Sequence, residues 1–358
     1  MPFLPILTMG EKMNTNKNIT KKILLIGTGG TIASDITPHG LSPNFDASEL
    51  AASVPGLEKI CKADCLALYS LDSTNISPGH WCKIVETIKE YYGAYDGFVI
   101  THGTDTMAYT AAALSYLIQD SSKPIVLTGS QRPPGFDGSD AKTNLRDSFI
   151  CAASGSLPGV TVVFDGRVIA GTRAKKTHSK SLNAFESINF PCLAGISGGR
   201  LIRYIEAKPR GGVRFYNRLE ADIGLLRMYP TIKADQLEHM LSSCDGAVIE
   251  SYGSGGLPVY RDGEFEKILS RAFERGVFVA MTTQVEHDGS DLDAYAVGRR
   301  LTKYPRLLEC YDMTAEAAVA KLAWVLSLSR NTSAVRELFY KPVMFDIFPP
   351  DDTDDCLI

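Results

Sequence analysis

The sequence predicts an α/β protein with two domains, a larger N-terminal doubly wound sheet followed by a smaller Rossmann-like α/β domain. The first reason is length, because 358 residues exceed the size at which a single hydrophobic core stops growing. The second is that strand-like runs alternate with helical patterns along most of the chain. The third is that these runs are continuously apolar, which is typical of parallel strands covered on both faces of the sheet.

The expected strands are six short apolar runs separated by polar or glycine-containing loops. They are Lys22–Gly27, Gly97–Thr101, Pro124–Thr128, Gly159–Phe164, Asp245–Ser251 and Gly276–Thr282. Three helices are expected with them. The first follows Ser77 and Pro78, which suit a cap and the first helical position ahead of an amphipathic segment. The other two helices are Thr106–Leu117 and Thr314–Leu328.

The domain organisation is predicted from segments that lack a clean period. Residues 203–222 are polar and contain one proline and two adjacent glycines, as expected of an exposed linker. We therefore expect an N-terminal extension at 1–20, a catalytic α/β domain at 21–202, the linker at 203–222, a second α/β domain at 223–345 and an acidic tail at 346–358. The apolar stretch at Pro2–Thr8 is short and has no basic residue before it, so we expect neither a signal peptide nor a membrane span there.

Composition excludes several classes of function. The net charge of −4 gives no basic surface for nucleic acid, and no part of the sequence suggests a membrane partner. The eight cysteines lie scattered, and the nearest pair, Cys61 and Cys65, has no second pair or histidine cluster that would complete a zinc site. We expect reduced thiols in a cytoplasmic protein, with no metal and no organic cofactor.

A glycine-rich turn at the end of the first strand is the most informative segment of the chain. Gly27, Gly29 and Gly30 allow a tight turn and a close approach of the backbone to a ligand. A dinucleotide fingerprint needs a small residue where Ile32 stands, and a Walker phosphate loop needs a Gly-Lys-Ser/Thr that does not follow. What remains is either an ordinary tight turn or a loop that presents a threonine, Thr31.

The ends of further strands carry hydroxyl groups beside glycine. The second strand ends in THGTDT at 101–106, and the third ends in Thr128, Gly129 and Ser130. Ligands of open α/β sheets bind at the carboxyl ends of the strands, so these loops predict a pocket for a polar small molecule. Chance clustering of small polar residues is the competing explanation.

Within that pocket the residue types suggest nucleophilic catalysis. A threonine is a poor nucleophile until a neighbouring group takes its proton. Asp105 and a lysine from the loop after the fourth strand are the charged groups available, since a lysine beside a carboxylate can relay protons. Helix capping is the competing role for Thr104 and Asp105, and a solvated charge run is the competing role for Lys176.

These motifs together resemble the bacterial-type L-asparaginases, and the cytoplasmic type I branch most closely. The resemblance runs from about residue 21 to residue 335. It rests on TGGTI at 28–32 and HGTDTMAYTAAALS at 102–115, with further similar segments. Those are LDST at 71–74, VLTGSQRP at 126–133, SDAKTNL at 139–145, KTHS at 176–179, NAFESIN at 183–189 and SYGSGG at 251–256.

The resemblance implies a double-displacement amidohydrolase that converts L-asparagine to L-aspartate and ammonia. In it, Thr31 would attack the side-chain amide, while Thr104, Asp105 and Lys176 would relay protons and orient the attacking groups. The substrate-binding residues would be Asp72, Ser73, Thr74, Thr104, Asp105 and Ser130. Family members assemble as dimers or tetramers, so a homodimer or homotetramer is implied as well.

One position departs from the family pattern. Most members place a tyrosine in the mobile loop after the first motif, and an ungapped count of ten residues from Thr31 reaches Leu41. The residues Asn44, Phe45 and Asp46 are candidates for part of a lid. Without that tyrosine hydroxyl, activation of Thr31 would fall on another group, either Lys176 acting through water or a tyrosine from elsewhere in the chain.

Two other functions remain open at this stage. The same fold serves as the ammonia-producing subunit of an archaeal glutamyl-tRNA amidotransferase, which typically has an extra domain ahead of the first motif, and about twenty residues leave no room for it here. The second is a catalytically silent sensor of asparagine or aspartate. Leu41 keeps this alternative open, whereas the retention of Thr31, Thr104, Asp105 and Lys176 argues against it. The sequence does not distinguish asparagine from glutamine, because one methylene changes pocket affinity by only about 1–3 kcal/mol.

Overall fold

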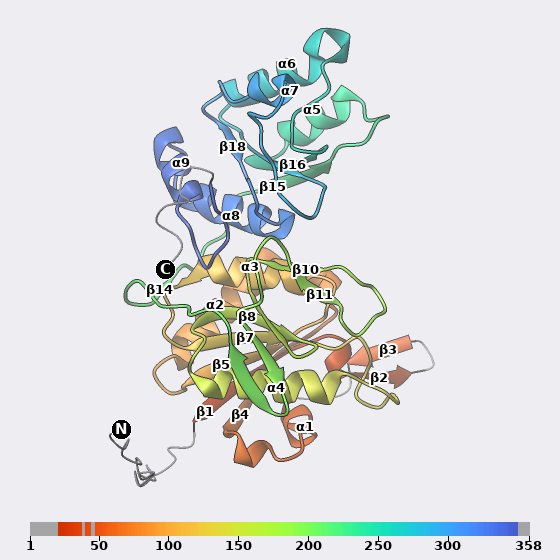
Figure 1. Ribbon diagram of the computed structural model, residues 1–358, viewed down its shortest axis with the longest axis vertical. Coiled ribbons are helices and arrows are strands. Elements are labelled where there is room, and N and C mark those ends of the chain that lie inside the picture. The colour runs from red at the N-terminus through yellow and green to blue at the C-terminus, as the bar shows by residue number, and fades with distance from the viewer. Residues whose placement is uncertain (1–20, 38–39, 44–46, 350–358) are drawn as a thin grey trace, which may run out of the picture.

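A computed structural model shows two α/β domains stacked along the long axis of the molecule (Figure 1). It describes residues 21–37, 40–43 and 47–349, with the side chains of 34–43 and of Arg261 left out. The larger domain holds an eight-stranded sheet and the smaller one a four-stranded sheet. The two-domain α/β architecture expected from the sequence is therefore confirmed.

The large sheet contains a parallel half and an antiparallel extension. Its order is β13 (Arg200–Arg203), β12 (Ala194–Ser197), β9 (Arg167–Ala170), β8 (Gly159–Phe164), β7 (Pro124–Thr128), β5 (Gly97–Thr101), β1 (Lys22–Gly29) and β4 (Lys62–Leu71). All pairs from β8 to β4 are parallel, and all pairs from β8 to β13 are antiparallel. The expectation of buried parallel strands is confirmed for β1, β5, β7 and β8, but the antiparallel extension was not predicted.

Helices cover both faces of the parallel half, which explains why its strands are continuously apolar. Successive side chains of a strand point to opposite faces. Leu24 and Phe98 therefore pack with α2 (Pro78–Tyr91) and α3 (Met107–Leu117), while Leu25 and Val99 pack with α1 (Ala47–Ala52) and α4 (Ala141–Ser154). The predicted start of α2 at Pro78 is confirmed, with Ser77 as the residue before it.

Short elements complete the large domain. They are the antiparallel pairs β2 (Ser34–Thr37) with β3 (Gly40–Pro43), β10 (Ala174–Lys176) with β11 (Phe185–Ser187), and β6 (Ile118–Gln119) with β14 (Arg214–Phe215), and the 3-10 turns η1 (Thr31–Ala33), η2 (Leu57–Lys59) and η3 (Ser73–Asn75). Leu41 lies in β3, and only its backbone is described. The lid candidates Asn44, Phe45 and Asp46 lie outside the described residues.

The small domain is a parallel sheet with helices on both faces. Its strands are, in spatial order, β15 (Ile223–Arg227), β16 (Gly246–Ser251), β17 (Phe278–Thr283) and β18 (Leu307–Glu309). Its helices are α5 (Ala234–Ser242), α6 (Tyr260–Glu274), α7 (Ala296–Arg299), α8 (Ala315–Leu328) and α9 (Thr332–Tyr340). Val248 and Phe278 pack toward α8, while Ala247 and Val279 belong to the core under α5 and α6.

Helices α3 and α8 form the contact between the two domains (Figure 1). Both are rich in alanine and are buried on almost every side, which suits helices placed between two sheets. Tyr116 on α3 stacks against Trp324 on α8 with ring centroids 6.0 Å apart. The packing joins the two sheets through one continuous hydrophobic core.

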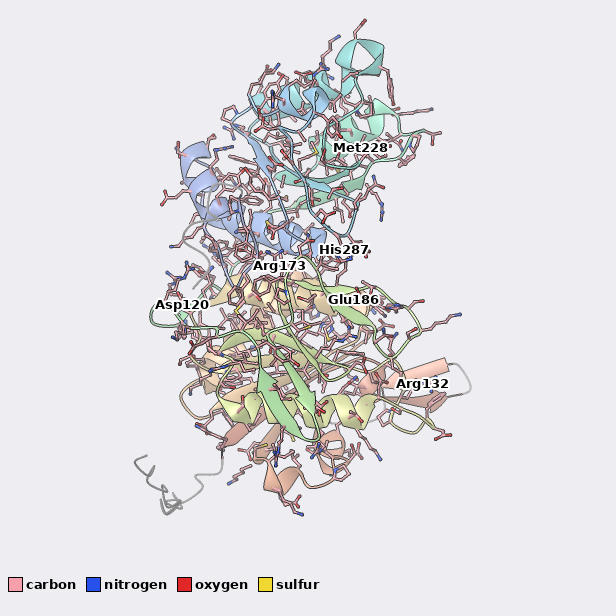
Figure 2. The ribbon with its side chains drawn as sticks, viewed as in Figure 1. Asp120, Arg132, Arg173, Glu186, Met228 and His287 are labelled. Atoms are coloured by element: carbon pink, nitrogen blue, oxygen red, sulfur yellow. The ribbon has the colours of Figure 1, made fainter. Side chains whose placement is uncertain are left out.

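The segment after α9 returns to this contact and ties the domains together. Asp346 is fully buried, its carboxylate lies 2.6 Å from Lys321 Nζ, and it accepts a hydrogen bond of 2.9 Å from the Tyr116 hydroxyl. Arg173, which Figure 2 shows at the junction of the domains, donates to the Asp312 carbonyl and carboxylate at 2.7 Å each. The segment expected to begin an acidic tail thus starts with a carboxylate buried against an ammonium group.

Candidate active site

The loops after β1, β4 and β5 meet through backbone contacts that only glycine permits. Gly30 has a φ of +84°, and a Cβ atom there would lie 2.3 Å from the Gly103 nitrogen. A Cβ on Gly103 would in turn lie 2.6 Å from Ser73 Oγ. These contacts place Thr31, Ser73 and the residues after Gly103 at one edge of the sheet. The strand-end argument named the loops after β1 and β5, but not the loop after β4 that carries Ser73.

A lysine, a threonine and an aspartate form a connected polar group at this edge. Lys176 Nζ donates to Thr104 Oγ1 at 2.8 Å and to Asp105 Oδ1 at 2.7 Å. The lysine comes from β10, more than 70 residues further along the chain than the other two. Capping is not what Thr104 and Asp105 do here, because α3 starts at Met107 with Thr106 as its N-cap.

The exposure of this group is graded from buried to open. Thr104 is 6% exposed, whereas the Lys176 side chain is 18% and the Asp105 side chain 62% exposed. Ion pairs that solvent reaches contribute only about 0–1 kcal/mol to stability. The arrangement therefore adds little to folding, and it presents an ammonium and a carboxylate to anything bound at the sheet edge.

Thr31 is the other threonine of the site and lies in η1, directly after the Gly30 contact. It is half-buried, and within the described part of the chain its hydroxyl has no hydrogen-bond partner. Thr31 and Thr104 therefore differ in how firmly the described residues hold their hydroxyl groups.

The loop after β4 brings the expected substrate-binding residues. Asp72 Oδ1 accepts hydrogen bonds from Thr74 N and Thr74 Oγ1, both at 2.9 Å, and Ser73 is buried against Gly103. The Ser73 carbonyl accepts a bond of 2.7 Å from Thr106 Oγ1, which fixes this loop to the start of α3. Asp72 is exposed, and among the described contacts its second carboxylate oxygen has no hydrogen-bond partner.

The loop after β7 reaches the same edge. A Cβ on Gly129 would lie 2.4 Å from the His102 carbonyl oxygen. Ser130 is fully buried, and among the described residues its hydroxyl has no partner. The next residue, Gln131, accepts a hydrogen bond of 3.3 Å from Thr104 Oγ1.

A buried histidine supports the loop after β5, which carries Thr104, from the side of the core. His102 Nδ1 lies 2.7 Å from the Gly103 carbonyl oxygen, which can only accept, so this nitrogen carries the proton. The Nε2 atom then accepts from Thr110 Oγ1 at 2.9 Å, and that hydroxyl accepts from Trp81 Nε1 at 2.9 Å. Burial lowers the pKa of His102 to about 4, so the ring is neutral near pH 7.

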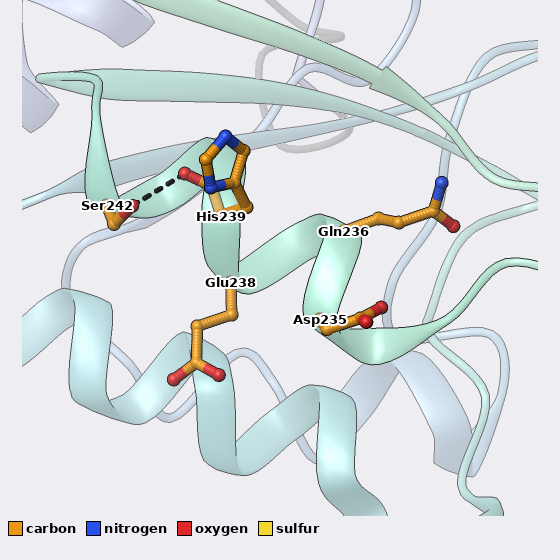
Figure 3. A pocket seen from close by; sticks show the side chains of 5 residues that line it. All are labelled: Asp235, Gln236, Glu238, His239 and Ser242. Atoms are coloured by element: carbon orange, nitrogen blue, oxygen red, sulfur yellow. Dashed lines mark hydrogen bonds between the residues drawn. The ribbon is translucent and has the colours of Figure 1, made fainter.

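Two other features are absent from the described residues. No group of His, Cys, Asp and Glu among them is arranged to hold a metal ion, and none of their helices is long and apolar enough to cross a membrane. Figure 3 shows a shallow hollow along α5, where Asp235, Glu238 and His239 point outward from one helix. It lies in the small domain, away from the threonine loops.

Sequence reasoning missed two residues of this edge, Gln131 and His102. Gln131 follows Ser130 in the loop after β7, but it has no hydroxyl group and does not neighbour a glycine, so the rule that selects Ser130 does not select it. His102 stands inside the quoted THGTDT segment, but nothing in the sequence indicates that it faces the core. The structure brings together Thr31, Ser73, Thr104, Asp105, Ser130 and Lys176 from four loops and a strand.

Comparison with known proteins gives matches along nearly the whole chain. The family model described as "Asparaginase, N-terminal" matches residues 22–209, and "Glutaminase/Asparaginase C-terminal domain" matches residues 222–339. An L-asparaginase of Thermococcus kodakarensis is 38% identical over 331 residues, which cover 91% of this chain and 99% of that protein. A glutamyl-tRNA(Gln) amidotransferase subunit of Pyrococcus abyssi is 34% identical, over 92% of this chain and 77% of that subunit.

Solved structures give the same result. The thermostable L-asparaginase from Thermococcus kodakarensis superposes with a TM-score of 0.85 at 37% identity, covering 92% of this chain and 99% of that one. L-asparaginase I from Vibrio cholerae superposes with a TM-score of 0.82 at 30% identity, covering 92% of this chain and all of that one.

Proposed function

The chain belongs to the asparaginase family, and on that premise we propose that it is an L-asparaginase that hydrolyses L-asparagine to L-aspartate and ammonia. The observation that carries the proposal is the contact of Lys176 with Thr104 and Asp105, beside the Gly30–Gly103 contact that brings Thr31 to the same edge. Two hydroxyl groups and a lysine that can relay protons therefore meet at one place.

In the first half of the proposed reaction, Thr31 Oγ1 attacks the side-chain amide carbon of asparagine. Its proton leaves to a neighbouring base, and the tetrahedral oxyanion rests on backbone N–H groups of the glycine loops. The C–N bond then breaks, the nitrogen takes up a proton, and ammonia departs. What remains is an acyl group esterified to Thr31.

In the second half, water attacks that ester. We assign to Thr104, Lys176 and Asp105 the orientation of the water and the relay of its proton, and the contact of the lysine with both partners supports this assignment. The ester bond breaks, Thr31 regains its proton, and aspartate leaves. Leu41 has no hydroxyl group, so we assign the first proton of Thr31 to another group.

Recognition of the substrate is assigned to Asp72, Ser73, Thr74, Thr104, Asp105 and Ser130. A free amino acid presents an ammonium and a carboxylate, and the exposed carboxylates of Asp72 and Asp105 suit the ammonium through charge-assisted hydrogen bonds. Among the described residues the buried hydroxyl of Ser130 is unpartnered, so it is available for a polar atom of the ligand.

We further propose that the chain forms a homodimer or homotetramer and acts in the cytoplasm. Large apolar side chains are exposed on the small domain, among them Val285 at 50% and Tyr295 at 66%, and such surfaces are often covered by a partner. All seven described cysteines are free thiols, which suits a reducing compartment. The domain boundary is proposed within residues 203–222, where the two family models leave a gap after 209. A mass near that of one chain in a fully active sample would contradict the oligomer.

Ammonia release from L-asparagine tests the function, with L-glutamine assayed in parallel and Thr31→Ala as the control. Release that vanishes in the variant supports the proposal. Binding of asparagine without any release would instead support a sensor. A rate that rises only with tRNA or a partner subunit would favour an amidotransferase component, although this chain spans 99% of the asparaginase relative and 77% of the amidotransferase relative.

A further inference from the structure

The side chain of Gln131 bridges the two parts of the proton relay. Its Oε1 atom accepts a hydrogen bond from Thr104 Oγ1 at 3.3 Å. Its Nε2 atom donates to the carbonyl oxygens of His178 at 3.3 Å and Ser181 at 3.1 Å. Those carbonyls belong to the loop that directly follows Lys176. The amide of Gln131 therefore contacts both Thr104 and the loop next to the lysine.

The two carbonyl oxygens fix which way the amide faces. A carbonyl can only accept, so the NH₂ group of Gln131 must point to His178 and Ser181. The amide oxygen is then left to face Thr104. Because Lys176 donates to the Thr104 oxygen from the other side, the hydroxyl proton of Thr104 is directed to Gln131.

The backbone of Gln131 is held just as firmly. Its N–H donates to both carboxylate oxygens of Asp140, at 3.0 and 3.1 Å. Asp140 is buried and also accepts from Asn144 Nδ2 at 3.0 Å, and the same amide group donates to the Gly129 carbonyl at 3.0 Å. The start of α4 therefore fixes the position from which Gln131 reaches the relay.

We propose that Gln131 is a positioning residue. It orients the Thr104 hydroxyl, and it holds the loop that follows Lys176 so that the lysine stays within hydrogen-bond distance of Thr104. The inference rests on the proposed function. A neutral amide is suited to this task, because it directs the proton of Thr104 without binding it as tightly as a carboxylate would. The bond of 3.3 Å is long for O–H···O and therefore weak, so the amide would act by directing the Thr104 hydroxyl rather than by binding it tightly.

Two substitutions separate this role from a purely structural one. Gln131→Met keeps the length of the side chain and removes both polar atoms, so kcat should fall by roughly 10–100-fold with KM nearly unchanged. Gln131→Glu keeps an acceptor for Thr104 but places a carboxylate against two carbonyl oxygens and beside Lys176. The added negative charge favours the ammonium form of the lysine, so the activity profile should move to higher pH.

Gln236→Met and Gln236→Glu are the matched controls, because Gln236 is an exposed residue of α5 in the other domain. Both should retain wild-type kcat and pH profile. Wild-type kcat in Gln131→Met, or a rise in KM alone, would overturn the proposal, as would an unmoved pH profile in Gln131→Glu.

Hydrogen exchange without substrate tests the same inference without using turnover. Gln131→Met should increase amide exchange of residues 177–184 relative to wild type, since two carbonyls of that loop lose their tether, while Gln236→Met should leave it unchanged. Equal amide exchange in all three proteins would contradict the proposal that Gln131 holds this loop. If the wild-type chain released no ammonia, the proposed function would be wrong. The exchange experiment would still show whether Gln131 holds the loop that follows Lys176.

Discussion

Thr31 and Thr104 lie in adjoining loops at the same sheet edge, yet their surroundings differ. The Thr104 hydroxyl contacts Lys176 and Gln131, and its loop is supported by the buried hydrogen-bond chain behind His102. The Thr31 hydroxyl has no partner in the part of the chain that the structure describes. Among these residues, one threonine is set in place before substrate arrives, and the other is not.

The difference fits the two chemical tasks that we propose. A group that relays protons works best when its partners are already fixed, because no reorganisation is then needed during the reaction. A nucleophile must instead leave its oxygen free to approach a carbon atom. The Gly30–Gly103 contact allows both requirements to be met within one small region, since it joins the loops by backbone and leaves the side chains independent.

The largest effects are expected from removing either hydroxyl group. Thr31→Ala and Thr104→Ala should each abolish turnover, lowering kcat roughly a thousandfold or more, because the first removes the attacking oxygen and the second removes an oxygen of the proton relay. Steady-state ammonia release measures the loss, and circular dichroism should show an unchanged fold. Thr31→Ser and Thr104→Ser retain an oxygen and should keep measurable activity. A wild-type rate in either alanine variant would refute that residue's assigned role.

Lys176→Met should be nearly as severe, because it leaves Thr104 and Asp105 without the group that joins them. A lost proton relay costs on the order of 10²–10⁴ in kcat. The neighbouring residue gives the matched control. Lys175 is paired with the exposed Glu286 at 3.6 Å, so Lys175→Met should be mild. Equal losses in the two variants would show that charge density, rather than the Thr104 contact, supports activity.

The buried His102, which supports the loop after β5, predicts that the stability of the protein falls in acid. The folded pKa of His102, about 4, lies below its ordinary value of 6.5, so on acidification the unfolded chain binds the proton first. The free energy of unfolding should be fully retained above about pH 6.5 and fall by about 3 kcal/mol toward pH 4 from this residue. Denaturant titrations across that pH range give the free energy of unfolding at each pH. Plotted against pH, this free energy should change more steeply for wild type than for His102→Gln, and an equal pH dependence in the two proteins would contradict the assignment.

The smallest effect is expected at the outer end of the same chain of hydrogen bonds. Trp81→Phe removes one N–H donor from Thr110 but leaves the bond between Thr110 and His102. The change should cost about 1 kcal/mol of stability and leave kcat close to wild type. Thermal unfolding measures the first and ammonia release the second. A large loss of activity would mean that the hydrogen bonds of Trp81, Thr110 and His102 influence Thr104 more strongly than the contacts indicate.

Local pattern was enough to predict the parallel half of the large sheet. The strands β5, β7 and β8 have the expected bounds, because an apolar run between glycine or proline residues leaves few alternatives. The edge strand β4 was missed, since Lys62–Leu71 mixes charged and apolar residues and is only partly buried. The short antiparallel strands β9, β12 and β13 depend on pairing partners that no local pattern reveals.

The site was predicted unevenly for a similar reason. Thr31, Thr104 and Ser130 stand beside glycine at strand ends, so general rules select them. Lys176 lies within a run of basic residues and is assigned through family resemblance, because its contact with Thr104 joins residues that are 72 positions apart in the sequence. Gln131 carries no charge and has no periodic pattern, so only its three hydrogen bonds reveal it.

The buried pair of Lys321 and Asp346 has a practical consequence for anyone who shortens or fuses this chain. Cutting before Asp346 would leave an ammonium group in an apolar interior without its counter-charge, and breaking such a pair costs about 3–5 kcal/mol. A purification tag or fusion partner should therefore be joined after Pro349, so that the returning segment can still fill its place between the domains. A shortened chain that lost Asp346 would be expected to express poorly even with every proposed catalytic residue present.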